Sequence, residues 1–203
     1  AKVRALDLTP ELIERARENS AIAAVDVDWH QGDAEELPFK DGEFDVVVSQ
    51  FGHMFAPRPE VAIGEMVRVL KPGGRIAFST WPPEHSVGRM FLLMASYMPP
   101  PPIEVPPPVL WGDPNIVRQR LGNAVKDIAF NRGVMLVPAL SPEHVRVNSE
   151  KSVGPLIKLV EMLSVKEPDR LAAFRRDYDQ LAAEYLEDNA IRQDYLITRA
   201  TKA

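Results

Sequence analysis

The most informative stretch of the chain is residues 32–50, which read Gly32-Asp33-Ala34-Glu35-Glu36-Leu37-Pro38-Phe39-Lys40-Asp41-Gly42-Glu43-Phe44-Asp45-Val46-Val47-Val48-Ser49-Gln50. Asp33 brings a carboxylate directly after a run in which apolar and polar residues alternate. Pro38 and the pair Asp41-Gly42 are typical of a loop. The run from Phe44 to Ser49 is almost continuously apolar, which predicts a parallel strand buried on both faces. We therefore expect a turn, a loop and a buried strand in this order.

Local signals on both sides of this stretch predict alternating strands and helices. Thr9 and Pro10 are typical of the N-cap and first position of a helix. Lys71-Pro72-Gly73-Gly74 combines a basic residue with two glycines, as helix ends often do. The expected strands are 2–8, 25–31, 44–49 and 75–81, with helices from residue 10 and over 59–70. This order of short units predicts an α/β fold around a mainly parallel sheet.

The character of the sequence changes after residue 82. Seven prolines fall between Pro99 and Pro108, which predicts an extended or loop segment there. The pattern predicts helices over 86–98, 112–121, 155–163 and 168–187, a helical turn from residue 141, a hairpin around 131–133 and a last short strand over 195–199. We expect one domain over residues 1–203, in which 1–82 form a core and 83–190 form a helical cover.

Composition narrows the class of protein. The chain has 203 residues, 45% of them hydrophobic and 26% charged, so it can fill a core. The formal net charge of -5 argues against non-specific binding to nucleic acid or to an anionic membrane. Cysteine is absent, and the four histidines show no metal-ligand spacing, so no metal site is expected. No run approaches a membrane span or resembles a signal peptide, and a soluble, cytoplasmic protein is expected.

Two acids follow strands that should be neighbours in the sheet. A carboxylate at a strand end, such as Asp7, can accept both hydrogen bonds from a ribose diol. Asp33 and the Ala34 amide could meet the amino group and a ring nitrogen of adenine. The alternatives are a surface acid at residue 7 and an Asp33 that caps a short helix over 34–37. Taken together, the two positions favour an adenine-containing ligand.

The sequence resembles the class I S-adenosylmethionine-dependent methyltransferases, and especially the small-molecule enzymes of the ubiquinone/menaquinone-biosynthesis type. Four segments carry the likeness: Leu6–Pro10, Gly32–Phe39, Phe44–Ser49 and Leu70–Arg75. The resemblance implies a Rossmann-like, mainly parallel sheet with helices on both faces and an inserted helical cover. It also implies a first strand and a Gly-x-Gly-x-Gly cofactor loop, which have no match here and would lie upstream of residue 1.

The resemblance assigns roles to individual residues. It implies that Asp7, followed by Leu8, holds the ribose hydroxyls, and that Asp33 and Ala34 hold the adenine. Ser49, Gln50 and Phe51 would pass close to the methionine part of S-adenosylmethionine.

Methyl transfer from this cofactor mainly needs orientation and a dry site. A general base is needed only when the acceptor holds its proton, and His53 is then the best-placed candidate; the alternative is a loop or pocket-wall histidine.

The expected cover suggests where an acceptor could bind. Phe91, Met94, Tyr97 and Trp111 would line a hydrophobic acceptor pocket, or they would simply pack in the core. The proline segment could instead bind a proline-recognising module. The apolar stripe on the 168–187 helix most simply packs on its own domain, with a homodimer contact as the alternative. Trp81 could reach the ligand crevice or close the end of the sheet.

These observations predict an S-adenosylmethionine-dependent methyltransferase that acts on a small, apolar molecule. One alternative is a nicotinamide-dependent oxidoreductase on the same topology, but no tyrosine has a lysine four residues later. The other alternative is a non-catalytic interaction protein on this fold, whose helices pair with a partner.

Overall fold

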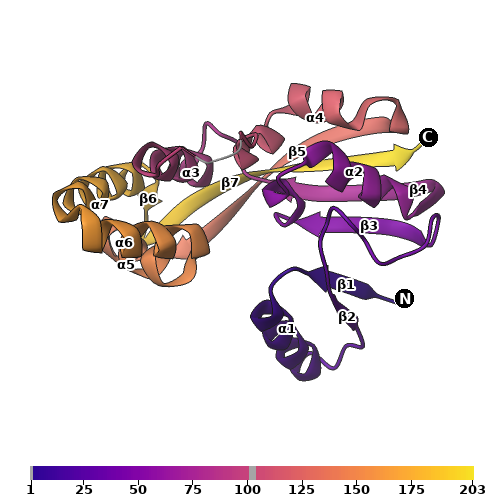
Figure 1. Ribbon diagram of the computed structural model, residues 1–203, viewed down its shortest axis with the longest axis horizontal. Helices are drawn as coiled ribbons and strands as arrows, with labels where there is room; N and C mark the ends of the chain where they lie inside the picture. The colour runs from indigo at the N-terminus through magenta and orange to yellow at the C-terminus, as the bar shows by residue number, and fades with distance from the viewer. Residues whose placement is uncertain (1, 101–103) are drawn as a thin grey trace. The chain divides into compact units, whose positions relative to one another are not determined.

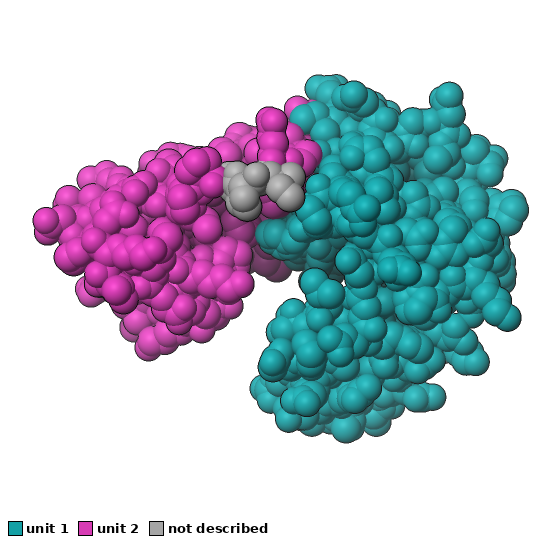
Figure 2. Space-filling view, in the orientation of Figure 1, with its two compact units in different colours: residues 1–79, 115–129, 198–203 teal, residues 80–114, 130–197 magenta. Residues whose placement is uncertain are grey.

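The computed structural model describes residues 2–100 and 104–203, which divide into two compact units (Figure 2). Unit 1 comprises residues 1–79, 115–129 and 198–203, and unit 2 comprises residues 80–114 and 130–197. The long strands β5 (Val125–Pro138) and β7 (Ala190–Lys202) contribute residues to both units. The expected division at residue 82 stays a prediction, and the contact pattern adds residues 115–129 and 198–203 to the first unit.

Unit 1 begins with the expected alternation of strands and helices (Figure 1). Its elements are β1 (Arg4–Asp7), α1 (Pro10–Ile22), β2 (Asp28–Gln31), β3 (Phe44–Gln50), the 3-10 helix η1 (His53–Phe55), α2 (Pro59–Arg68), nearly all of β4 (Leu70–Thr80), α4 (Pro114–Leu121) and η3 (Gly122–Ala124). Pro10 and Pro59 each occupy the start of a helix, where a missing N–H costs nothing. The predicted strand and helix order through residue 80 is confirmed.

Two parallel pairings organise unit 1. β1 pairs with β2 in a two-stranded sheet, and β3 pairs with β4 in a larger mixed sheet with strand order β3-β4-β7-β5. Residues 71–74, which the sequence predicts to end the helix over 59–70, instead lie within β4. The register with β3 shifts there, from Phe44↔Leu70 to Val46↔Arg75. Gly73 has a φ of 72° there, a left-handed conformation that glycine adopts without strain.

Strand β3 departs from the expectation of burial on both faces. Val46 and Val48, which share one face, are 46% and 73% exposed. β3 ends the strand order, so one of its edges has no hydrogen-bonded neighbour among the described residues. An apolar run therefore predicted the strand correctly but not its cover, because cover comes from elements distant in sequence.

Unit 2 is built on packed helices. It contains α3 (Ser86–Tyr97), η2 (Pro108–Gly112), α5 (Pro142–Ser152), α6 (Gly154–Lys166), α7 (Pro168–Ala183) and the short strand β6 (Leu186–Glu187). Leu156, Leu159, Leu163 and Phe174 have no exposed side-chain surface in its core. Leu171, Phe174 and Tyr178 of the predicted α7 stripe all lie in this core, which accounts for the stripe without a second copy of the chain.

The hairpin expected around residues 131–133 is wrong, because β5 continues through them as one strand. Gly133 serves close packing instead of a turn: a Cβ there would lie 2.3 Å from the Tyr195 ring of β7. The last strand is also longer than the predicted 195–199 and runs from Ala190 to Lys202.

Of the proline segment, residues 101–103 lie outside the described residues, while residues 99–100 and 104–107 have no regular structure, as predicted. Every helix in the described part of the chain is too short or too polar to cross a bilayer.

Candidate functional site

The carboxyl ends of β1 and β2 lie side by side in unit 1. Asp7 is in register with Gln31, and the Gly32 N–H donates to the Asp7 carbonyl oxygen at 3.0 Å. Asp33, two residues beyond Gln31, is therefore brought to the same end of the two-stranded sheet as Asp7. In open α/β sheets, ligands bind beyond these carboxyl ends of the strands.

Gly32 lies at this junction in close contact with the Leu6 side chain. A Cβ at this position would lie 2.7 Å from Leu6 Cδ1, closer than carbon atoms pack. The bare backbone lets the chain turn away from β2 directly against the side chain of β1. Asp33 consequently leaves the sheet as part of a tight turn.

The Asp7 carboxylate is held in place and keeps acceptor capacity. Its Oδ1 accepts a hydrogen bond from the Thr9 N–H at 2.8 Å, at the start of α1. Within the described residues the structure gives this side chain no other partner, and the residue is half-buried. A carboxylate has about four lone-pair sites, so a ribose diol could still be accepted. Leu8, the next residue, is 65% exposed.

Asp33 has a similar arrangement in the turn after β2. Its Oδ1 accepts from the Glu35 N–H at 2.8 Å, and its carbonyl accepts from the Glu36 N–H at 3.1 Å. The alternative in which Asp33 caps a short helix is wrong, because residues 34–37 form no helix. The side chain is exposed, and Oδ2 has no partner among the described residues. Ala34 follows it, half-buried.

An ion pair between the buried Glu35 carboxylate and the exposed Arg58 side chain fixes the turn that carries Asp33. Glu35 is 7% exposed, and its two carboxylate oxygens accept from the backbone N–H and the Nε–H of Arg58 at 2.5 and 2.7 Å. Arg58 immediately precedes α2. The turn after β2 is thereby tied to the start of a helix 23 residues later. Charge-assisted hydrogen bonds of this kind are among the stronger polar contacts in proteins.

The loop that follows the turn is anchored to the same helix. Glu65 Oε2 accepts from the Leu37 N–H at 2.8 Å, while Arg68 donates to the carbonyls of Leu37 and Phe39 at 3.0 and 2.8 Å. The hydrogen bond from Arg68 is the main reason that the pKa of Glu65 lies below its usual value. The loop is therefore braced along its length by α2.

The end of β3 adopts an unusual backbone conformation. Phe51, the first residue after the strand, has a φ of 60°, which non-glycine residues seldom adopt. Its N–H donates to the Ser79 carbonyl at 3.1 Å, which fixes the conformation. Strained residues of this type cluster at ligand sites. Gln50 is exposed and Ser49 is half-buried, so this strand end is accessible.

His53 lies behind Ser49 and is almost fully buried. Its Nδ1 is 3.0 Å from Ser49 Oγ, its backbone N–H donates to the same atom at 3.2 Å, and its ring packs on Phe78 with centroids 4.5 Å apart. Burial, assisted by the positive charge of Arg120, lowers the pKa of His53 to about 3. The ring is therefore neutral at pH 7. A base works best with a pKa near the operating pH, so this geometry suits a positioning role toward Ser49 better than proton abstraction.

Sequence reasoning missed Glu35 and Arg58. Nothing in the pair Glu35-Glu36 distinguishes a buried acid from an exposed one, since the distinction depends on a partner 23 residues away. The only local signal was Pro59, which correctly placed a helix start next to Arg58.

Of the four residues predicted to line an acceptor pocket, Phe91 lines a cavity of unit 2, and Met94, Tyr97 and Trp111 do not. Phe91 lines a cavity, together with Trp81. Met94 is 2% exposed and packs in the core, while Tyr97 contacts that core and donates to Asp177 at 2.6 Å. Trp111 is 1% exposed, and its carbonyl accepts from Thr80.

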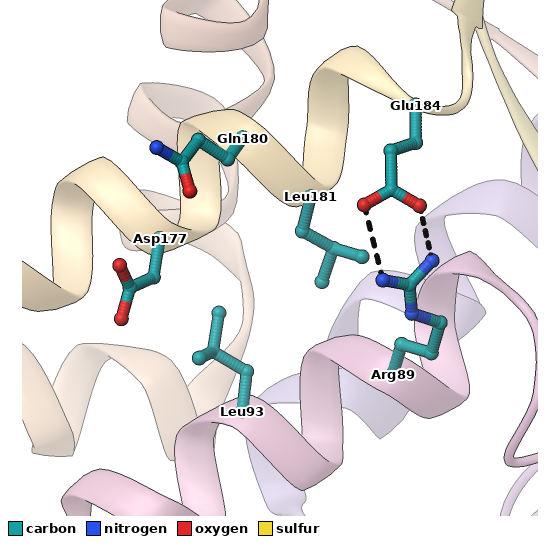
Figure 3. Close-up of a pocket in the computed structure, with 6 residues that line it drawn as sticks. All are labelled: Arg89, Leu93, Asp177, Gln180, Leu181 and Glu184. Carbon is teal, nitrogen blue, oxygen red and sulfur yellow. Dashed lines mark hydrogen bonds and ion pairs between the residues drawn. The ribbon is translucent and has the colours of Figure 1, made fainter.

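A second, more open pocket lies on the surface between α3 and α7 (Figure 3). Arg89 of α3 and Glu184, just past α7, form an ion pair across it, with one hydrogen bond of 3.1 Å. The charges of this pocket are thus partly neutralised by each other. Its residues lie on two helices and the turn after α7, so its carboxylates do not follow neighbouring strand ends as Asp7 and Asp33 do.

Comparison with known proteins places these features in a family. The family described as "Methyltransferase domain" matches residues 1–78. An uncharacterized protein of Mycobacterium tuberculosis is 36% identical over 203 residues, which is all of this chain and 74% of that protein. The ubiquinone/menaquinone biosynthesis C-methyltransferase UbiE of Ruegeria sp. is 47% identical over 73 residues, which is 35% of this chain and 29% of that protein.

A solved structure supports the fold. A Bacillus halodurans protein assigned as a methyltransferase superposes with a TM-score of 0.59 at 20% identity, over 100% of this chain and 83% of that chain. Together with the family match, this defines an α/β methyltransferase of the Rossmann-like type. The chain belongs to the class I S-adenosylmethionine-dependent methyltransferases, in one family with the mycobacterial protein. Its cofactor is accordingly S-adenosylmethionine.

Proposed function

We propose that this enzyme transfers a methyl group to a small, apolar molecule by in-line displacement. The observation that carries the proposal is the pair of carboxylates at neighbouring strand ends, each with acceptor capacity left over. The apolar acceptor is supported by unit 2, which encloses a cavity of about 230 Å³ without a charged residue in its lining. The limited likeness to UbiE also favours a small molecule as the acceptor.

The residues of unit 1 fit the cofactor. Asp7 would accept hydrogen bonds from the ribose hydroxyls, and Asp33 from the adenine amino group. The Ala34 amide would donate to a ring nitrogen. Leu8, exposed beside Asp7, would contact the adenosyl group, and the strand end formed by Ser49, Gln50 and Phe51 would face the methionine part.

The chemistry asks little of the protein beyond positioning. When bound, S-adenosylmethionine supplies a methyl group already activated on a sulfonium. The chain's own contribution is to hold the reactants in line and to exclude water. His53 holds the Ser49 hydroxyl at the end of β3, and a catalytic role for its ring would require an acceptor proton within its reach. A cytoplasmic location stays a prediction, and so does the homodimer contact that was the alternative for the 168–187 helix.

Calorimetric titration with S-adenosylhomocysteine tests the cofactor site. It should be done on the protein as it occurs naturally. Asp33→Ala is expected to weaken binding by about 1–3 kcal/mol, because the adenine amino donor loses its acceptor. Glu36→Ala is the matched control, since this neighbouring acid is exposed and contributes only backbone contacts to the turn.

Equal affinities of the Asp33 and Glu36 variants would remove Asp33 from the site. A thermal-shift panel should include a nicotinamide dinucleotide. Stabilisation by that compound and none by S-adenosylhomocysteine would contradict the proposed function.

A further inference from the structure

Unit 2 contains a cavity whose walls are mostly apolar. It lies among α3, α5 and α7, of which α3 and α5 each pack on α7 (Figure 1), and its lining includes residues of β7. Met90, Val145, Ala182 and Ile191 line it, and each is at most 9% exposed. The volume of about 230 Å³ is roughly that of seven or eight molecules of liquid water, so a compact ligand is required.

Two hydroxyl groups meet in the lining of this cavity. The Tyr178 hydroxyl of α7 donates to Ser149 Oγ of α5 at 2.9 Å. Met90 Sδ lies 3.3 Å from the same phenol, but a thioether sulfur is a weak acceptor and the phenol is the more acidic of the two hydroxyls, so Tyr178 donates to Ser149. Ser149 is therefore an acceptor in this pair, and its own proton is not used in it.

The proton of Ser149 has no acceptor among the described residues. Ser152, on the same helix, shows the usual alternative, because its hydroxyl donates to the Asn148 carbonyl at 2.8 Å. Ser149 makes no such bond to the preceding turn within the described part of the chain. A hydroxyl at a cavity wall with an unused proton is a donor available to a ligand.

The other polar side chains of the lining carry no charge, and two of them already donate their hydroxyl protons to backbone carbonyls. Ser86 donates its hydroxyl proton to the Arg192 carbonyl at 2.7 Å, and Tyr185 donates to the Glu84 carbonyl at 3.3 Å. The half-buried Gln193 carboxamide is given no partner by the described residues, so it can supply one donor and one acceptor. The surface pocket of Figure 3 differs, because Arg89, Asp177 and Glu184 line it.

We propose that this cavity is a ligand site for an uncharged, compact, apolar molecule with an oxygen atom that accepts a hydrogen bond from Ser149. Burying an ionised group in an apolar cavity without a partner is costly, which excludes charged ligands. An oxygen opposite Ser149 would satisfy the hydroxyl proton of this lining that has no acceptor among the described residues.

Three probes of one shape test the inference by calorimetry without any cofactor: 1-naphthol, naphthalene and 1-naphthoate at pH 7. The wild type is expected to bind 1-naphthol more tightly than naphthalene and to bind 1-naphthoate undetectably. Ser149→Ala should weaken 1-naphthol binding about two- to twelve-fold, because the ligand loses its hydrogen bond. Naphthalene binding should stay unchanged, because the Tyr178 hydroxyl can still donate to Met90 Sδ at 3.3 Å. Ser152→Ala on the same helix is the matched control and should change neither affinity.

A variant that narrows the cavity tests ligand binding there without changing the Ser149 hydroxyl. Ala182→Leu adds side-chain volume at the wall and should weaken both uncharged probes, with folding checked by circular dichroism. The inference is overturned if no uncharged probe binds, if 1-naphthoate binds as well as 1-naphthol, or if Ser149→Ala leaves 1-naphthol binding unchanged.

Asp33→Ala separates this inference from the proposed function. It should weaken S-adenosylhomocysteine binding and leave 1-naphthol binding intact, because Asp33 belongs to unit 1 and the cavity to unit 2. Probe binding without any binding of S-adenosylhomocysteine would contradict the proposed function and sustain the cavity as a ligand site. Binding of S-adenosylhomocysteine without binding of the uncharged probes would do the reverse.

Discussion

Lowering the pH from 7 to 5 is expected to reduce the free energy of unfolding by about 2 kcal/mol through His53 alone. The folded-state pKa of about 3 arises first from burial of the ring and then from the positive charge of Arg120. The unfolded chain should titrate near the ordinary histidine value of about 6.5. Between these two values the unfolded state binds more protons than the folded state.

The sign follows from this difference. The contribution of His53 is complete above pH 6.5 and is lost as the pH falls from there toward 3. Each pH unit within this window costs about 1.4 kcal/mol for one group, so the 1.5 units between 6.5 and 5 give the stated value. The range from pH 8 to 5 stays above the ordinary pKa of carboxylates, which keeps their titration small.

Urea unfolding at several pH values, followed by circular dichroism, measures the slope. His53→Asn is the informative variant, because an asparagine can still meet Ser49 Oγ but does not titrate. Its stability should change by about 2 kcal/mol less than that of the wild type between pH 7 and 5. His144→Asn is the control for the loss of a histidine elsewhere, because its ring accepts from the Leu140 N–H in unit 2; this variant should keep the contribution of His53.

A second measurement examines the ring directly. The NMR chemical shift of the His53 Cε1 proton should show no inflection between pH 8 and 5. An inflection near pH 6.5, or equal slopes for the wild type and His53→Asn, would refute the argument that burial keeps this ring neutral.

Two further substitutions probe contacts that the fold depends on. Glu35→Ala should lower the free energy of unfolding by about 1–3 kcal/mol, because the Arg58 N–H loses its buried acceptor; thermal denaturation would measure this, and an unchanged midpoint would contradict the role of the pair. Gly133→Ala should cost about 1–3 kcal/mol, because the added methyl overlaps the Tyr195 ring. Gly154→Ala is its control, with no heavy atom within 4 Å of the added carbon; equal effects of the two would argue against the overlap.

The order of elements could be predicted from the sequence because its signals are local. Thr9-Pro10 and Ser141-Pro142 mark helix starts through the backbone geometry of one turn, and both helices begin at the proline. The apolar run after Phe44 predicted a strand for the same reason. The positions of Asp7 and Asp33 after two parallel strands then sufficed to bring the acids to one sheet edge.

The rest depended on partners far away in the chain. The exposure of Val48, the role of Gly133 beside Tyr195 and the burial of Glu35 against Arg58 each need a contact, or the lack of one, that no local pattern encodes.

For the stretch from Gly32 to Gln50, the sequence alone determined the turn, the loop, the strand and the kinship with methyltransferases. Backbone propensity and apolar periodicity act over a few residues, so one chain segment is enough to specify them. Only the tertiary structure decided that the turn is tied to α2 through Arg58 and that His53 is buried and neutral behind Ser49. Burial and electrostatics depend on which distant segments meet, and they are therefore properties of the folded molecule.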